Sequence, residues 1–130
     1  MTAAPQVVID ASALLAALHN EPGGEVVEPR LSHAAMCSVN WTEVVQKTLS
    51  WGIDIDGLRR DVEGIGLTIV PFTAVDAETS VGLWSPTRPL GLSLADRACL
   101  ALARRLDLPV LTSDREWARL DVGVVIETVR

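Results

Sequence analysis

A chain of 130 residues, 48% of them hydrophobic, is long enough to bury one core, which excludes extended disorder. Its two cysteines, Cys37 and Cys99, are far apart and match no C-x-x-C pattern. This excludes a disulfide scaffold and a thiolate zinc site, and it fits a reducing cytoplasm. The net charge of −6 weighs against a nucleic-acid partner. However, ten of the eleven basic residues are arginine, whose planar side chain fits phosphate bidentately, so charge alone leaves the partner open.

The amino-terminal region contains short apolar runs but does not have the pattern of an export signal. Asp10 interrupts the apolar run, and no lysine or arginine precedes Arg30. A signal peptide needs a basic start followed by an unbroken apolar stretch. No segment reaches the roughly 18 consecutive apolar residues that a membrane span requires. We therefore expect a cytoplasmic protein with no membrane contact.

Strand-like and helix-like patterns alternate along the chain. Short apolar runs predict strands at residues 6–10, 34–38, 67–70, 109–111 and 124–129. The predicted helices cover residues 12–20, 39–51, 54–64 (capped by Asp54), 74–84, 94–106 and 115–120, with a weaker helical piece at 25–32 and a loop at 85–91. This alternation predicts a single α/β domain over residues 1–130, with a central, mostly parallel sheet and helices on both faces.

Four carboxylates stand out by their positions. Asp10 ends the predicted strand at 6–10 and Asp114 comes shortly after the predicted strand at 109–111, and sites in open sheets form outside the carboxyl ends of the strands. Asp96 and Glu43 lie on predicted helices. Each acid also has an ordinary structural interpretation. Asp10 and Asp114 suit helix N-caps, Asp96 completes a capping box three residues after Ser93, and Glu43 suits a solvated helix surface.

Asp96 fits its ordinary interpretation least well. On a helical wheel it lies at the edge of an apolar face that includes Leu100 and Ala103, so its carboxylate is partly desolvated. An unpaired buried charge is costly, and no basic residue shares that side of the helix. A metal ion, or a basic partner from elsewhere, would remove the cost. Glu43 gives no such support, because its apolar neighbours centre on the opposite face of its helix.

Several carboxylates close together have a chemical use. Hydrolysis of a phosphodiester requires an activated water and neutralised charge on the phosphoryl oxygens, and Mg²⁺ or Mn²⁺ held by carboxylates provides both. Oxygen ligands without histidine or cysteine favour these metals over zinc. His19 and His33 lack metal-ligand spacing, and we interpret both as surface or helix-end residues.

Three segments carry the four acids in order along the chain. The first, VVIDASALLAAL, contains Asp10; the second, SVNWTEVV, contains Glu43. The third, LSLADRACLALARRLDLPVLTSDREW, contains Asp96 and ends its T-S-D motif at Asp114. Together they resemble the PIN-domain family, and most closely the VapC toxins of bacterial type II toxin–antitoxin pairs. The resemblance covers nearly the whole chain.

The resemblance implies a Mg²⁺-dependent endoribonuclease, with Mn²⁺ as a substitute ion, in which the carboxylates converge at one edge of a parallel sheet. It implies that Asp10 and Asp96 are direct metal ligands and that Asp114 is a direct or water-mediated ligand. Glu43 would position water or a second ion. All four acids of the family pattern are present, so the resemblance implies an active enzyme.

The resemblance also implies partners: an RNA substrate, a cognate antitoxin that covers the acidic site, and a second copy of the chain in a homodimer. The hydroxyl groups of Ser12, Thr112 and Ser113 would orient carboxylates or contact the RNA backbone, with ordinary turn bonding as the alternative. For Trp51 and Trp84 we expect core positions, with interface anchoring as the alternative.

Two alternatives to a toxin remain. A non-toxin PIN-type nuclease would act in RNA processing or on DNA, because the metal chemistry does not distinguish the sugar. A non-catalytic binding module of the same fold would use the acids only as helix caps. A measurement of Mg²⁺ binding separates the second alternative from an enzyme.

Overall fold

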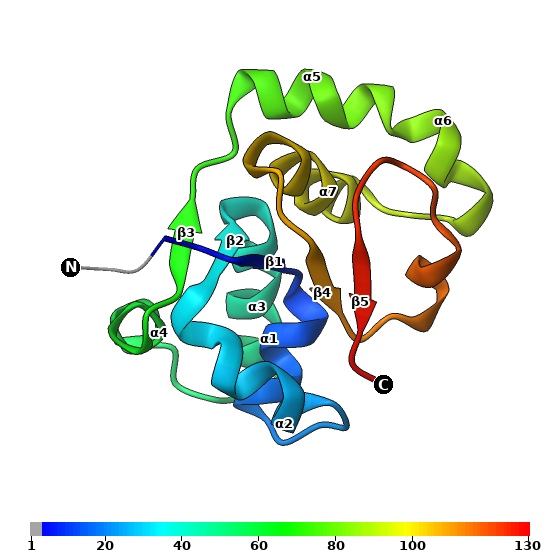
Figure 1. Ribbon diagram of the computed structural model, residues 1–130. Helices are drawn as coiled ribbons and strands as arrows, with labels where there is room; N and C mark the ends of the chain where they lie inside the picture. Colours follow the sequence, from blue (N-terminus) through cyan, green and yellow to red (C-terminus); the bar gives the residue numbers. More distant parts are fainter. Residues whose placement is uncertain (1–3) are drawn as a thin grey trace.

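The centre of the molecule is a five-stranded parallel sheet (Figure 1). The computed structural model describes residues 4–130, so residues 1–3 of the predicted domain lie outside the described range. The sheet order is β3-β2-β1-β4-β5, and all four pairings are parallel. The strands are β1 (Val7–Ile9), β2 (Ala34–Cys37), β3 (Thr68–Val70), β4 (Val110–Thr112) and β5 (Ile126–Thr128). The predicted α/β class and parallel sheet are confirmed, and every predicted strand is present.

Helices connect the strands and cover both faces of the sheet. They are α1 (Ala11–Leu18), α2 (Gly24–Val27), η1 (Glu28–His33), α3 (Ser38–Ser50), α4 (Leu58–Ile65), α5 (Ala74–Gly82), α6 (Trp84–Thr87), η2 (Arg88–Leu90), α7 (Leu94–Leu106) and η3 (Arg115–Arg119), where η denotes a 3-10 helix. In Figure 1, α5 and α6 lie over α7 on one side of the sheet, and α1 and α2 lie on the other. The bounds of α7 are those predicted.

Two predictions about local structure are wrong. Asp54 does not cap α4, because its carboxylate accepts the backbone N–H of Asp56 in a turn, and the helix begins four residues later behind Gly57. Gly57 has a φ of 76°, a conformation that glycine adopts without steric cost. Residues 85–91 are not a loop but contain α6 and η2, whose prolines lie in their first turns, where a missing N–H is tolerated.

Alternating side chains of the strands divide the core into two parts. Val7 and Ile9 point to one face, with α1, α2 and α4 packed against it. Val8 points to the other face, where it meets α7 and Trp117. Because successive side chains of a strand alternate, Asp10 follows Val8 toward the α7 side. The sheet therefore places the carboxylate after β1 next to the amino-terminal half of α7.

Helix α5 is fixed to α7 by polar contacts. The carboxylate of Asp76 is almost fully buried and accepts two hydrogen bonds from the guanidinium of Arg105, at 2.8 and 3.1 Å. Burial raises the pKa of Asp76, but the hydrogen bonds and charge of Arg105, together with the Thr73 cap, outweigh burial and hold that pKa below its ordinary value. Arg97 also donates to the carbonyl of Ser80. These contacts attach α5 to the side of α7 that faces away from the sheet.

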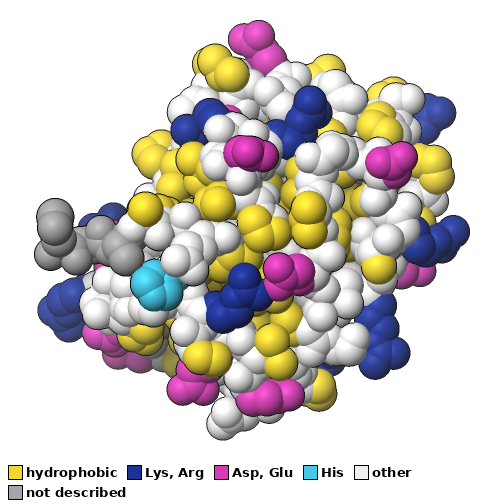
Figure 2. All heavy atoms as spheres, viewed as in Figure 1, with side chains coloured by type: hydrophobic (Ala, Val, Ile, Leu, Met, Phe, Trp, Pro, Cys, Tyr) yellow, Lys and Arg dark blue, Asp and Glu magenta, His cyan; other side chains and the backbone are white. Residues whose placement is uncertain are grey.

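In residues 4–130, no helix is both long and apolar enough to cross a membrane. Figure 2 shows acidic and basic side chains interspersed over one face of the molecule, with apolar atoms between them. This face therefore presents no extended surface of a single charge.

Candidate active site

Asp10 is the most buried of the four predicted acids, with 5% of its surface exposed. It directly follows β1 and caps α1, accepting the backbone N–H of Ala13 at 2.9 Å. The hydroxyl groups of Ser12 and Thr112 donate to its two carboxylate oxygens at 2.7 and 2.6 Å. Three donors therefore fix the carboxylate in one orientation.

These donors do not neutralise the charge of Asp10. Burial raises the pKa of Asp10 to about 6, the three hydrogen bonds oppose that rise, and the charge of Asp96 adds to it. None of the ion pairs formed within residues 4–130 includes Asp10. An ionised, buried carboxylate without a cation is unfavourable, so this position favours either protonation or a bound positive charge.

Asp96 lies in the first turn of α7, and the predicted capping box is present. Its backbone N–H donates to the Ser93 hydroxyl at 3.1 Å, and its carboxylate accepts the backbone N–H of Ser93 at 2.9 Å. The cap engages the Oδ2 atom of Asp96. The charge of Asp96 also acts on Asp10 and on Glu43, raising the pKa of each. The ordinary interpretation of Asp96 is thus realised, and its charge still reaches two other acids.

Glu43 lies on α3 at the surface, where Asn40 holds it. Partial burial of its carboxyl group and the charge of Asp96 raise the pKa of Glu43, and a hydrogen bond from Asn40 opposes the rise. The Nδ2 atom of Asn40 donates to Glu43 at 3.2 Å and to the carbonyl of Ala95 at 3.0 Å. Asn40 is 1% exposed, and its Oδ1 atom has no hydrogen-bond partner among the described residues.

Sequence reasoning missed Asn40. Its amide joins the helix that carries Glu43 to the residue before Asp96, so it positions two of the four acids relative to each other. The available signal was an asparagine three residues before Glu43, one helical turn away on the same side of α3. A single asparagine in a helix is too common to be singled out from sequence alone.

Asp114 is exposed. It caps η3 by accepting the backbone N–H of Glu116, and its own N–H donates to the Thr112 hydroxyl at 3.1 Å. Since Thr112 also donates to Asp10, these two acids are linked through one hydroxyl group. The structure therefore brings Asp96 within electrostatic reach of both Asp10 and Glu43, and it connects Asp114 to Asp10 through Thr112.

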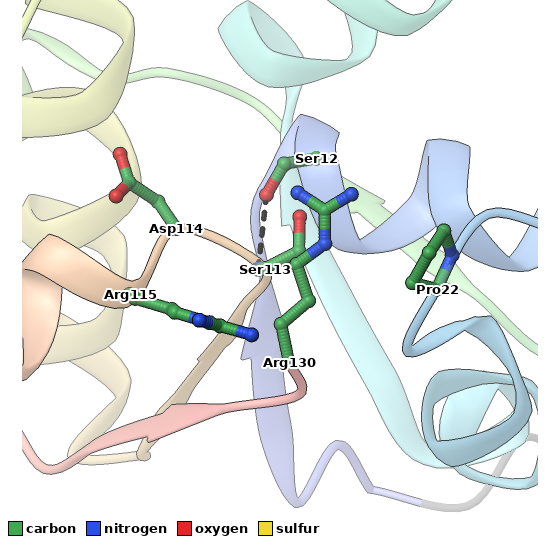
Figure 3. A pocket seen from close by; sticks show the side chains of 6 residues that line it. All are labelled: Ser12, Pro22, Ser113, Asp114, Arg115 and Arg130. Carbon is green, nitrogen blue, oxygen red and sulfur yellow. Dashed lines mark hydrogen bonds between the residues drawn. The ribbon is translucent and has the colours of Figure 1, made fainter.

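Two of the three hydroxyl residues, Ser12 and Thr112, bond to Asp10, and the third, Ser113, bonds to Ser12. Thr112 is fully buried, so its position favours the orientation of Asp10 over contact with a substrate. Ser12 donates to Asp10 and accepts the backbone N–H of Ser113 at 3.1 Å. Ser113 is almost buried, and it lines an open groove beside Ser12 (Figure 3).

Whether these residues suit a divalent metal depends on their chemistry and their arrangement. Within residues 4–130, no group of three or more acidic, histidine or cysteine side chains has the arrangement needed to hold a metal ion. Asp96 and Asp114 direct carboxylate oxygens to their own helix caps. The donor chemistry nevertheless fits Mg²⁺, because the site offers only carboxylate and hydroxyl oxygens and because Asp10 is buried without a cation. The cap bonds of Asp96 and Asp114 each engage one carboxylate oxygen, so the second oxygen of each can face an ion while the cap is kept.

The remaining predicted residues lie outside this cluster. His19 follows α1 and His33 ends η1, so both are helix-end residues as interpreted. The expected core positions of Trp51 and Trp84 are wrong, because 43% and 48% of their surfaces are exposed. Trp51 directly follows α3, and Trp84 is the first residue of α6. A basic side chain lies over each ring, Lys47 over Trp51 and Arg88 over Trp84. Trp117 is the tryptophan that fills the core.

The chain belongs to the PIN-domain family, whose model matches residues 7–123. The fold is similar to a toxin–antitoxin complex from Klebsiella pneumoniae (TM-score 0.74, 21% identity, covering 92% of this chain and 96% of that chain). It is also similar to VapBC2 from Rickettsia felis bound to a DNA fragment from its promoter (TM-score 0.70, 14% identity, 95% and 98%).

A third similar structure is VapC20 of Mycobacterium tuberculosis, described as a sarcin–ricin loop cleaving toxin (TM-score 0.63, 12% identity, covering 92% and 99%). Comparison with curated protein sequences gives no match. The predicted membership of the PIN-domain family is therefore confirmed, and the fold is similar to those of VapC-type structures.

Proposed function

We propose that this chain is the toxin of a type II toxin–antitoxin pair, a Mg²⁺-dependent endoribonuclease that cuts RNA at Asp10, Glu43, Asp96 and Asp114. The observation that carries the proposal is the Asp10 carboxylate: buried, held by three donors, unpaired by any cation in residues 4–130, and within reach of the charge of Asp96. Such a concentration of negative charge costs stability unless a cation binds it. The PIN fold supports the proposal that the bound cation serves in nuclease chemistry.

Each residue has a role in this proposal. Asp10 and Asp96 hold the ion, Asp114 holds it directly or through water, and Glu43 positions water or a second ion. A bound Mg²⁺ would supply an activated water and neutralise charge on the phosphoryl oxygens. Ser12 and Thr112 keep the Asp10 carboxylate in one orientation, and Asn40 holds Glu43 beside the start of α7.

The choice of RNA and of a toxin rests on the structural relatives. One is described as cleaving the sarcin–ricin loop, and another is described as a toxin–antitoxin complex. On this basis we propose a cognate antitoxin as partner, and we retain the homodimer and the cytoplasmic location as part of the same hypothesis.

A second candidate is a non-catalytic binding module of the same fold. The cap bonds of Asp10, Asp96 and Asp114 favour it, because each acid already has a structural use. The burial of Asp10 opposes it, since a serine, threonine or asparagine would cap α1 without a buried charge.

Expression of the chain alone in a bacterial host tests the toxin. Growth arrest is expected, with relief by a small protein encoded beside its gene and with no arrest by Asp10→Asn at equal soluble level. Normal growth of cells that contain the soluble, unaltered chain would contradict a toxin.

A further inference from the structure

We infer that Arg115 and Arg130 form a phosphate-binding subsite for the RNA strand, in a groove that opens beside Asp10. This inference rests on the proposed function and assigns residues outside the four acids. The groove has a volume of about 760 Å³ and is lined by Ser12, Pro22, Ser113, Asp114, Arg115 and Arg130. Figure 3 shows both arginine side chains at this groove, with the Arg130 guanidinium beside Ser113 and the hydroxyl that Ser12 turns to the Ser113 backbone.

The fold fixes both arginines at this groove. Arg115 directly follows Asp114 at the carboxyl end of β4. Arg130 follows Val129, whose N–H donates to the carbonyl of Thr112 at 3.0 Å and so continues the pairing of β5 with β4. The turn before α2 also approaches closely, because a Cβ atom on Gly23 would lie 2.5 Å from the carbonyl oxygen of Val129. Only glycine permits this approach, which keeps Pro22 and Arg130 on opposite sides of one groove.

The charges of these two arginines are available to a ligand. Neither Arg115 nor Arg130 takes part in an ion pair within residues 4–130, whereas Arg30, Arg59 and Arg105 are paired with acids. Both are exposed. A polyanion that reaches the four acids is repelled by them unless positive charge lies along its path. The two unpaired guanidinium groups share the groove with Asp114 and so meet that need, and the guanidinium fork matches phosphate oxygens.

The groove continues into a second hollow with a different character. This hollow shares Ser12, Ser113 and Arg130 with the groove and extends to Lys47 and Trp51. The ammonium of Lys47 lies 5.5 Å from the centre of the Trp51 ring. Successive bases of a single strand stack on exposed aromatic rings beside basic groups. The two hollows thus offer phosphate contacts at one end and an aromatic surface at the other.

Binding of a fluorescein-labelled single-stranded RNA 12-mer, measured by anisotropy without divalent metal, tests this subsite. All proteins carry Asp10→Asn, which prevents turnover. The groove variant adds Arg115→Gln and Arg130→Gln. The matched control adds Arg60→Gln and Arg104→Gln, which remove the same charge from exposed positions lining other hollows.

The groove variant is expected to bind at least tenfold more weakly than its parent and to lose about 1.4 from the slope of log affinity against log salt, at about 0.7 for each phosphate contact. The control should stay within twofold of the parent and keep its slope. Trp51→Ala should weaken binding about fivefold or more with the slope unchanged, because stacking releases no counterions. Equal binding by groove and control variants, or no measurable RNA binding by the parent, would overturn the inference.

A cleavage assay keeps this test separate from the proposed function. With Asp10 intact and Mg²⁺ present, the two groove substitutions should raise KM at least tenfold while kcat changes by less than threefold. Cleavage with an unchanged KM would overturn the subsite and leave the nuclease standing. No cleavage by the unaltered chain would contradict the nuclease, and the binding measurement would still decide the subsite. Binding of an oligo-aspartate peptide is measured with the same variants. If peptide binding depends on the two arginines and RNA binding does not, the groove binds an acidic protein segment, and the inference is overturned.

Discussion

Replacement of Asp10 by asparagine tests whether Asp10 is only a helix cap or is also a metal ligand. Asparagine caps a helix about as well as aspartate, so the bond from Ala13 is kept. In the variant, the side-chain NH₂ group of asparagine faces the Thr112 hydroxyl and donates to it. The Thr112 hydroxyl can accept this bond because its own proton can be donated to the Ser12 oxygen, 3.3 Å away. The substitution therefore removes a buried charge without leaving a buried polar group unpaired.

The size of the effect follows from the pKa of Asp10. The gap between about 6 in the folded chain and the ordinary 3.8 corresponds to up to about 3 kcal/mol, at about 1.36 kcal/mol per pH unit. Because the folded pKa is raised, the stabilising effect of the protonated carboxyl is fully present below about pH 3.8 and is lost as the pH rises through about 6. At pH 7.5 without metal, Asp10→Asn should therefore be more stable by up to about 3 kcal/mol, on the order of 10 °C in Tm.

The assay is thermal and urea unfolding from pH 4 to 8 in chelator, for the unaltered chain, Asp10→Asn and the exposed control Asp121→Asn. The stability difference between the first two should vanish near pH 4 and grow toward pH 8, while the control follows the unaltered chain. Millimolar Mg²⁺ or Mn²⁺ should raise the Tm of the unaltered chain and leave Asp10→Asn unmoved. A variant less stable than the unaltered chain at pH 7.5 in chelator would refute the reasoning that the Asp10 charge is uncompensated.

Two further variants test the supports of the site. Asn40→Ala should raise the pKa of Glu43, because the Asn40 hydrogen bond lowers it, and NMR titration of the Glu43 carboxyl that finds an unmoved midpoint would contradict this. Arg105→Ala leaves the buried Asp76 without its cation and should cost about 2 kcal/mol in urea unfolding, less than a fully buried pair because Arg105 is partly exposed. The neighbouring Arg104→Ala serves as its control, and an equal loss for both would contradict a specific pair.

The sequence was sufficient to predict the sheet and the best helix. Buried parallel strands are short apolar runs, and α7 has both a capping box at Ser93 and a continuous apolar face, so pattern and cap agree on its start. The predicted start of α4 is wrong because Asp54 suits a turn as well as a helix cap. The helix begins behind Gly57 instead. The prolines at 86 and 89 predict a loop at 85–91, but the first turn of a helix accepts proline, and α6 and η2 form there.

The candidate site was predictable as a set of residues but not as an arrangement. The resemblance to PIN domains implies that Asp10 and Asp96 lie close together, and in the structure the charge of Asp96 acts on Asp10. The sequence did not indicate that Asp10 rather than Asp96 is the most buried acid, because that depends on the packing of α1, β4 and α7 around it. Asn40 was missed because its partners, Glu43 and Ala95, come together only when α3 packs on α7.

Cleavage of total cellular RNA, with end mapping, tests most directly whether the acids perform catalysis rather than only capping. The proteins are the unaltered chain, Asp96→Asn and Ser93→Ala, each with millimolar Mg²⁺ and with chelator. The account predicts discrete fragments from the unaltered chain only with metal. Asp96→Asn should keep its fold and lose activity by about 100-fold or more, because a metal-binding charge is lost. Ser93→Ala should lose about 1 kcal/mol of stability with its cap and still cut. Cleavage by Asp96→Asn near the unaltered rate, or no cleavage by the unaltered chain with either Mg²⁺ or Mn²⁺, would contradict the account.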